Sequence, residues 1–514
     1  MDCAECGQRL RLQYTTWRKV ATLEGMLRLK VSIGRCENPA CAHYHRSTHP
    51  VEEGHVVLPH YEYGLDVLAF IGQRRYREQA TAKQIHAALE QRAVRISQRN
   101  VQYLLERYDE LVALSVRDSP ERRVRLETQG RLILAIDGLQ PDVGHEVLWV
   151  IREVLSGEVL LARSRLSSRQ ADLVALLREA IAGVKAPVVG VISDGQQSIG
   201  NAVAEAFPGV PHQLCQFHYW KQAVSPAWEA DRHAKKELKK RVRAIRPLER
   251  TVSEREDEEA QVVQGYCAAV RGALSDEGQA PLEPGGLRLH ERLEQIEASL
   301  QRAEKKGGLP KPLQRLHGIL ERALTATAAY WPPLAAMFQC IHEAVDLLEN
   351  PEQRPAAEVR ARYARWVHDF AKRLKTPVGE TIRHWGQHFV KITQSYWSGL
   401  FHTDDVDGLP RTNNDLEHLF GSLRHQERRI TGHKVASPSL IVRGAVRVLA
   451  AVITWANPLT PRQLGEVDPV AWHEERRQLG KLREARLQQR HFRQHPDTYL
   501  AALEERLLKL GLPP

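Results

Sequence analysis

The sequence has no uninterrupted apolar run long enough to cross a membrane. Its most apolar long stretch, Leu440–Trp455, contains Arg443 and Arg447, which predicts a buried core helix rather than a membrane span. No basic segment followed by an apolar one opens the chain, so we expect no signal peptide. These absences together predict a cytoplasmic protein without a membrane partner.

Cysteine is scarce, with 7 in 514 residues, and four of them lie near the start of the chain. The four are Cys3, Cys6, Cys36 and Cys41. An odd total with four thiols close together is typical of a metal site in a reducing compartment, not of a disulfide framework. Two short cysteine pairs joined by strand-like sequence predict a zinc ribbon over residues 1–58, with Zn²⁺ bound by the four thiolates. His43 and His45 are alternative ligands.

Internal repeats and long low-complexity tracts are also missing, and a hydrophobic fraction of 42% supports folded cores. At about 150 residues per domain, the length predicts roughly three to four domains. The chain has 73 Lys and Arg against 63 Asp and Glu, a net charge of +10, which favours a polyanionic partner without proving one.

Residues 61–115 have the apolar spacing of three helices, and Ser97 is placed to cap the third. The short turn at 93–96 fits a helix-turn-helix within a DNA-binding domain over residues 59–125. In that interpretation the exposed start of the third helix contacts DNA through Gln98, Arg99 and Gln102. A helical bundle that only packs the ribbon against the next domain is the alternative.

Two apolar runs each lead into an acid, and we expect the remainder of the chain to serve this pair. Leu132–Ile136 runs into Asp137, and Val188–Ile192 leads to Asp194, 57 positions later. Such runs predict strands buried on both faces. An acid at the end of a buried strand is costly unless a cation meets it, so the pair predicts a metal site.

The order of elements over residues 126–222 is three strands, a helix, a strand, a helix and a strand, which is the ribonuclease H-like order. The following residues, 223–408, are helical and charged, and the segment 221–250 has ten basic residues against four acidic ones. The fold class expected is therefore multidomain α/β: a ribonuclease H-like mixed sheet interrupted by a large all-α insertion. Residues 409–460 would close the core and 461–514 would form a charged helical tail.

A helix beginning near residue 412 presents Glu417 beside its apolar stripe. Basic residues follow on or near the same face and suit the phosphate backbone of DNA; they are Arg424, Arg428, Arg429 and Lys434. Four nearby acids compete with Glu417 as a third metal ligand: Asp404, Asp405, Asp407 and Asp415.

Taken in order, these features resemble a known family. They are Asp137 on a strand, Asp194 in a V-I-S-D-G segment, Cys215-x2-His218, a long helical insertion, and Asn414-x2-Glu417 on a helix. The pattern is similar to the DDE transposases of bacterial insertion sequences, and its layout to the Mutator-like and hAT transposases, over about residues 130–435.

The resemblance implies an enzyme that cuts and joins DNA, with Mg²⁺ or Mn²⁺ held by Asp137, Asp194 and Glu417. Carboxylate oxygens suit these hard cations, and two such ions can activate a nucleophile and stabilise a leaving oxygen. It also implies double-stranded DNA partners (terminal inverted repeats and target), a homodimer or higher oligomer on DNA, and association with the nucleoid. A catalytically silent, domesticated DNA-binding derivative and a structure-specific nuclease are the alternative functions.

Three further residues have uncertain roles in the sequence. Cys215 and His218 are two metal-ligand types, but two ligands do not make a site, and a structural role at a strand end is favoured. Trp397 can stack on an extruded base, although core packing is the simpler expectation.

Overall fold

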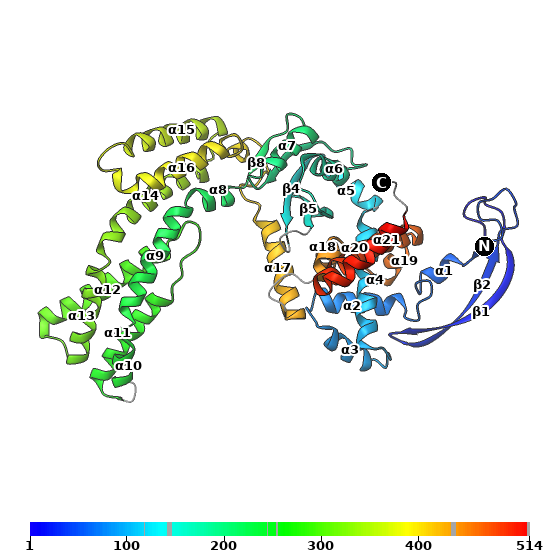
Figure 1. The fold of residues 1–514 in the computed structure, drawn as a ribbon, viewed down its shortest axis with the longest axis horizontal. Helices are drawn as coiled ribbons and strands as arrows, with labels where there is room; N and C mark the ends of the chain where they lie inside the picture. The colour runs from blue at the N-terminus through cyan, green and yellow to red at the C-terminus, as the bar shows by residue number, and fades with distance from the viewer. Residues whose placement is uncertain (118, 141–145, 244, 253–254, 433–437, 511–514) are drawn as a thin grey trace. The chain divides into compact units, whose positions relative to one another are not determined.

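The computed structural model describes residues 1–117, 119–140, 146–243, 245–252, 255–432 and 438–510 (Figure 1). The chain forms two compact units, each of which combines segments that are distant in sequence. The first contains residues 1–188, 201–208 and 415–514, and the second contains residues 189–200 and 209–414.

The N-terminal part of the first unit is a three-stranded antiparallel sheet in the order β1-β2-β3. Its strands are β1 (Arg11–Thr22), β2 (Gly25–Arg35) and β3 (Ser47–Thr48), and the short helix α1 (Val51–Gly54) follows. The strands expected between the two cysteine pairs are confirmed. Gly25 has a φ of +128° where the hairpin turns, a conformation that side chains disfavour.

The three helices expected next are confirmed as α2 (Leu65–Tyr76), α3 (Ala82–Glu90) and α4 (Gln98–Arg117). Ser97 caps α4 as predicted, because its hydroxyl accepts a hydrogen bond from the Asn100 N–H at 3.1 Å. Helices α2 and α4 pack closely at Gly72, where a Cβ atom would collide with the ring of Tyr108. Only glycine permits that approach.

Helix α5 (Pro120–Gln129) precedes an antiparallel meander of β4 (Leu132–Leu139), β5 (Val147–Glu153) and β6 (Val159–Arg165). The first six residues of β4 are buried, as expected of an apolar run inside a sheet. Gly157 occupies the turn between β5 and β6 with a φ of +76°. In the register of the sheet, Asp137 is opposite Val150.

The next elements are α6 (Gln170–Ala180), β7 (Val188–Ser193), α7 (Gln197–Ala206) and β8 (His212–Leu214). Strands β7 and β8 are parallel, so the five-stranded sheet is mixed, with the order β6-β5-β4-β7-β8. Helix α6 ends at Ala180, and a turn leads to Gly183, whose φ is +77°. The alternation of strands and helices predicted over this region is observed.

The second unit is helical, as predicted for the segment after β8. Its helices are α8 (Gln216–Ala223), α9 (Ser225–Val242), α10 (Ile245–Val252), α11 (Glu258–Ser275), α12 (Gly285–Gly307), α13 (Lys311–Thr325), α14 (Trp331–Glu349), α15 (Ala356–Arg373) and α16 (Arg383–Tyr396). They enclose a continuous apolar core that includes Leu289, Phe338 and Phe389.

The chain ends with α17 (Asn414–Thr431), α18 (Pro438–Ala456), α19 (Pro461–Gly465), α20 (Pro469–Gln494) and α21 (Pro496–Lys509). Helix α18 packs against α4 and β6. This confirms that the apolar stretch Leu440–Trp455, which lies within α18, is part of a core helix. Gly444 lets α18 approach β5, since a Cβ there would lie 2.9 Å from the Leu148 side chain. Among the residues placed by the structure, no helix has the length and apolar character needed to cross a membrane.

Candidate metal centre and candidate active site

The two cysteine pairs converge at the end of the N-terminal sheet. The Sγ atoms of Cys3, Cys6, Cys36 and Cys41 all lie within 4.8 Å of one another. Across the described ranges of the chain, this is the only group of three or more metal-ligating side chains gathered so closely. All four are free thiols, and three of them are buried.

The spacing of the sulfur atoms fits a tetrahedral metal. The Sγ atoms of Cys3 and Cys41 are 3.7 Å apart, and so are those of Cys6 and Cys36. A disulfide requires about 2.05 Å. A Zn–S bond of about 2.3 Å in a tetrahedron gives sulfur atoms about 3.8 Å apart. The four cysteines can therefore bind a metal such as zinc.

Backbone hydrogen bonds shape each cysteine pair and favour thiolates. The Gly7 N–H donates to the Cys3 carbonyl at 2.9 Å, and the His43 N–H donates to the Cys41 Sγ at 3.3 Å. The Gln8 backbone N–H is the main cause that lowers the pKa of Cys6 to about 7. The N–H groups of Cys6 and Glu5 likewise lower the pKa of Cys3. These two thiols ionise readily, whereas burial and hydrogen bonds from the neighbouring thiols raise the pKa of Cys36 and, to about 12, that of Cys41.

The two histidines considered as substitute ligands lie outside this cluster. The Nε2 atom of His43 is 3.9 Å from the Glu5 carboxylate, and the ring of His45 stacks on Tyr44 at 4.0 Å between centroids. Four cysteines already complete a tetrahedral set, so no histidine is required.

Asp137 lies within β4, two residues before the strand ends, and is 9% exposed. Its Oδ1 atom accepts a hydrogen bond from the Gly138 N–H at 2.7 Å. This acid belongs to the first unit, as does Glu417, whereas Asp194 belongs to the second.

Asp194 directly follows β7, and its Oδ1 atom accepts a hydrogen bond from the Gln196 N–H at 3.1 Å. Tyr396, at the end of α16, is an unexpected neighbour. Gly195 has no side chain, which leaves room for the Tyr396 hydroxyl beside the backbone. Burial, with the charge of Asp194 as a second cause, raises the pKa of Tyr396 to about 12, so this phenol stays protonated at neutral pH.

Glu417 lies in the first turn of α17 and is partly buried. Two of its four competitors are held by arginines: Asp415 pairs with Arg152 at 2.5 Å, and Asp404 pairs with Arg411 at 2.6 Å. An acid paired with a guanidinium group is a poorer metal ligand, which counts against Asp415 and Asp404.

The residues predicted to contact DNA in the helix-turn-helix segment are Gln98, Arg99 and Gln102, and all three are exposed on α4. Arg99 is not isolated, because its Nε donates to the Tyr103 hydroxyl at 2.9 Å. On α17, the predicted basic residues Arg424, Arg428 and Arg429 are exposed as well. Lys434 lies outside the described residues.

Cys215, His218 and Trp397 belong to the second unit. The Asn413 N–H donates to the buried Cys215 Sγ at 3.3 Å, and neither Cys215 nor His218 is in the metal-ligand cluster of the described chain. Trp397 packs against Phe401 at 5.1 Å and Tyr363 at 6.1 Å between ring centroids. Core packing, the simpler expectation for Trp397, is confirmed.

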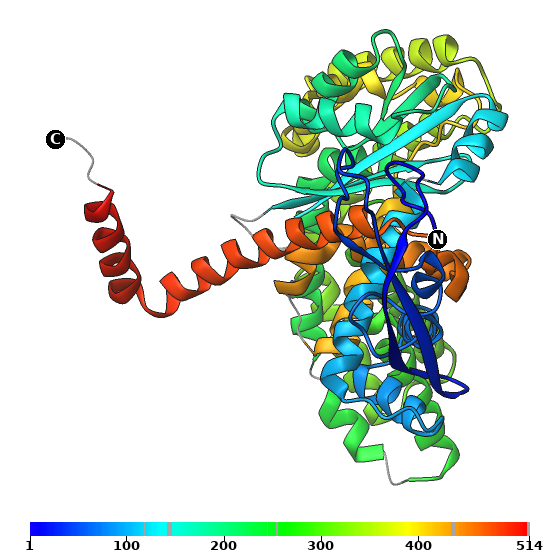
Figure 2. The same ribbon diagram turned by 90° about the vertical axis from the view of Figure 1, so that its right-hand side faces the viewer.

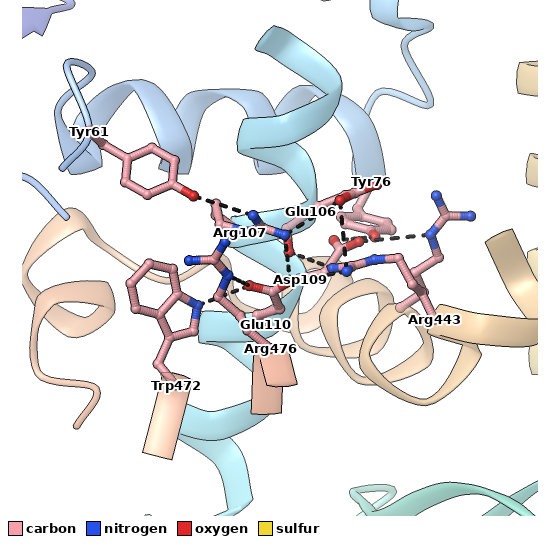
Figure 3. Close-up of polar contacts among 10 residues, drawn as sticks. Tyr61, Tyr76, Glu106, Arg107, Asp109, Glu110, Arg443, Trp472 and Arg476 are labelled. Atoms are coloured by element: carbon pink, nitrogen blue, oxygen red, sulfur yellow. Dashed lines mark hydrogen bonds and ion pairs between the residues drawn. The ribbon is translucent and has the colours of Figure 1, made fainter. Parts of the chain in front are cut away.

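A buried ionic network in the first unit was not predicted (Figure 3). Glu110 of α4 is at its centre: Oε1 accepts from Arg107 at 2.7 Å and Arg443 at 3.0 Å, and Oε2 accepts from Trp472 Nε1 at 2.9 Å. One carboxylate thus joins α4, α18 and α20. Removing one partner from such a buried set costs about 3–5 kcal/mol, because charges are left unpaired.

The comparisons with known proteins do not assign the chain. No protein-family model matches it, and no curated protein matches it.

Proposed function

We propose that the chain is a DNA transposase that cleaves phosphodiester bonds and transfers strands at the ends of a mobile element. In this proposal, residues 1–58 form a zinc ribbon, α2–α4 include a helix-turn-helix, and the five-stranded sheet is the ribonuclease H-like core. The four-cysteine cluster supports the first part, because its sulfur spacing suits Zn²⁺.

The observation that carries the proposal is the sheet. Three antiparallel strands are followed by a helix and a parallel pair, in the order β6-β5-β4-β7-β8. Asp137 is near the end of β4, and Asp194 directly follows β7. A long helical segment then separates these strands from Glu417 on α17. This is the sequence of elements that supports the resemblance to DDE transposases.

Asp137, Asp194 and Glu417 would hold the Mg²⁺ or Mn²⁺ ions, since carboxylate oxygens are the ligands that these hard cations prefer. When bound, two such ions would activate the attacking oxygen and stabilise the leaving one. The protein itself would orient the acids, and no covalent protein intermediate is needed. DNA contacts would come from Gln98, Arg99 and Gln102 on α4 and from the basic residues of α17.

The test is cleavage of DNA that carries the sequences flanking the coding region, with Asp137→Asn as the variant. We expect Mg²⁺-dependent cleavage to fall at least about a thousandfold, because a metal ligand is lost, while DNA binding measured by anisotropy stays nearly unchanged.

The matched control is Asp369→Asn, which removes the charge of an exposed acid on α15, outside the proposed triad and its four competitors. It should cleave like the unmodified protein. Normal cleavage by Asp137→Asn would refute the active-site assignment. Inverted repeats in the flanking DNA would support a mobile element, and their absence would favour the domesticated or nuclease alternatives.

A further inference from the structure

A cavity of about 670 Å³ in the first unit is lined mainly by arginine. It lies among α4, α18 and the second half of α20, and seven arginines and two glutamates line it. The two glutamates, Glu106 and Glu110, are already paired with Arg107 or Arg443. The cavity therefore has a strong excess of positive charge, and of the arginines of α20 its acids pair only with Arg476, at 4.0 Å from Glu110, among the described residues.

Four of the cavity arginines form a stripe on α20, defined as Arg483, Arg486, Arg490 and Arg493. Their spacing of three, four and three residues places them on one face of the helix. The same face holds Trp472 and Leu479 earlier in α20, where it is buried. Arg476 lies on this face between them, with its guanidinium group over the Trp472 ring, and beyond Leu479 the face is mainly arginine.

Arg486 of the stripe contacts its own helix, where its Nη1 donates a hydrogen bond to the Gln489 side chain at 3.0 Å, and the other three arginines are more exposed. Residues 481–494 are exposed except for the partly buried Arg486. Among the described residues, Arg483, Arg490 and Arg493 form no ion pair with the protein. A guanidinium group left without an acid on a helix surface is available to an external anion.

The first half of α20 fixes the stripe in place. Trp472 donates to Glu110, and Glu475 pairs with Arg117 of α4 at 3.0 Å. Helix α20 is continuous from this anchor to its end, so the stripe is presented on a rigid element (Figure 2).

The stripe also adjoins the surface that the proposed function assigns to DNA. Tyr103 of α4 lines the same cavity, and its hydroxyl accepts the hydrogen bond from Arg99. The exposed start of α4 and the arginines of α20 thus border one basic groove within the first unit.

We propose that the arginine stripe of α20 binds the phosphate backbone of double-stranded DNA independently of base sequence; this inference rests on the proposed function. At 1.5 Å per helical residue, Arg483 and Arg493 are about 15 Å apart along the axis. One DNA strand has a phosphate about every 3.4 Å along the duplex, so the stripe matches roughly four phosphates. Arginine binds phosphate with two hydrogen bonds, and backbone contacts position a protein without specifying sequence.

The experiment measures the affinity of the full chain for a random-sequence duplex by fluorescence anisotropy between about 50 and 200 mM salt. The variant is Arg490→Gln with Arg493→Gln, which removes the two exposed charges of the stripe that lie farthest along α20 from the anchor. Each lost phosphate contact should flatten the slope of log K against log salt by about 0.9, so we expect a change of about 2 and a tenfold or greater loss of affinity.

The control, Arg477→Gln with Lys481→Gln, removes two exposed charges from the same helix outside the cavity. We expect its slope to match that of the unmodified protein. An equal change in both variants, or no change in either, would overturn the stripe as a binding site. An equal loss of affinity for polyglutamate would show a general polyanion surface and would also overturn the proposal.

The outcome separates this inference from the proposed function. If the unmodified chain does not bind random duplex, both fail. If the unmodified chain binds random duplex and the stripe variant and its control have the same salt slope, only the inference about the stripe is refuted. The Asp137→Asn protein should bind the random duplex with the unmodified slope, because its change affects cleavage.

Discussion

Burial changes the pKa of a single carboxyl group, that of Asp109. Asp109 is fully buried on α4, where its Oδ1 accepts from the Tyr76 hydroxyl at 2.6 Å and its Oδ2 lies 3.8 Å from Arg447 Nε. Desolvation outweighs the nearby Arg443 and Arg447 and raises the pKa of Asp109 to about 6. Arg447 keeps a second partner, Glu427, at 2.7 Å.

This shift predicts a pH-dependent contribution to stability. The folded pKa, about 6, is above the unfolded value of about 3.9, so the contribution is complete below pH ~4 and is lost as pH rises through 6. Asp109→Asn keeps an acceptor for Tyr76 and does not titrate. We expect its free energy of unfolding, relative to the unmodified protein, to gain up to about 3 kcal/mol between pH 4 and pH 7.

Urea unfolding of both proteins across this pH range measures the difference between their free energies of unfolding. Other titrating groups are the same in both proteins, so their contributions cancel in this difference. A difference that does not change with pH would contradict the raised pKa of Asp109.

At the scale of elements, the four-cysteine cluster holds the N-terminal sheet. The strands β1 and β2 expose Leu12, Tyr14, Trp17 and Met26, so this sheet has little apolar core of its own. A metal bound by the four cysteines would supply the stability that so small a core does not.

Cys3→Ser should therefore reduce bound zinc below the value of about one ion per chain that we expect for the unmodified protein. Zinc retained after dialysis and measured by atomic emission is the readout, with Cys340→Ala, a thiol outside the cluster, as the control. Unchanged zinc in Cys3→Ser would contradict the assignment of Cys3 as a ligand.

Local sequence patterns predicted an element well where a particular residue type marks its boundary or its metal site. Ser97 marked the start of α4, and the cysteine pairs marked the ends of their sheet. Helix α5 was not predicted, because only Arg122 and Leu126 are buried on it and its apolar period is weak. The stripe of α20 was visible as arginine spacing, but its meaning depends on the cavity beside it.

At the scale of the whole molecule, the first unit brings together both ends of the chain. Glu110 and Arg443 are 333 positions apart and still form one hydrogen bond. No local pattern predicts such a pairing, since each residue alone is typical of an exposed helix face. The ionic network and the cavity of the first unit could therefore be found only from the folded chain.

The proposed function requires that the protein join DNA as well as cut it. The most direct measurement is strand transfer: a labelled duplex ending in the flanking sequence is incubated with a target plasmid, Mg²⁺ and protein. We predict labelled plasmid with the unmodified protein and none with Asp137→Asn, Asp194→Asn or Glu417→Gln, because each lacks a metal ligand. Labelled plasmid formed equally by these variants, or cleaved ends that are never joined, would contradict the account.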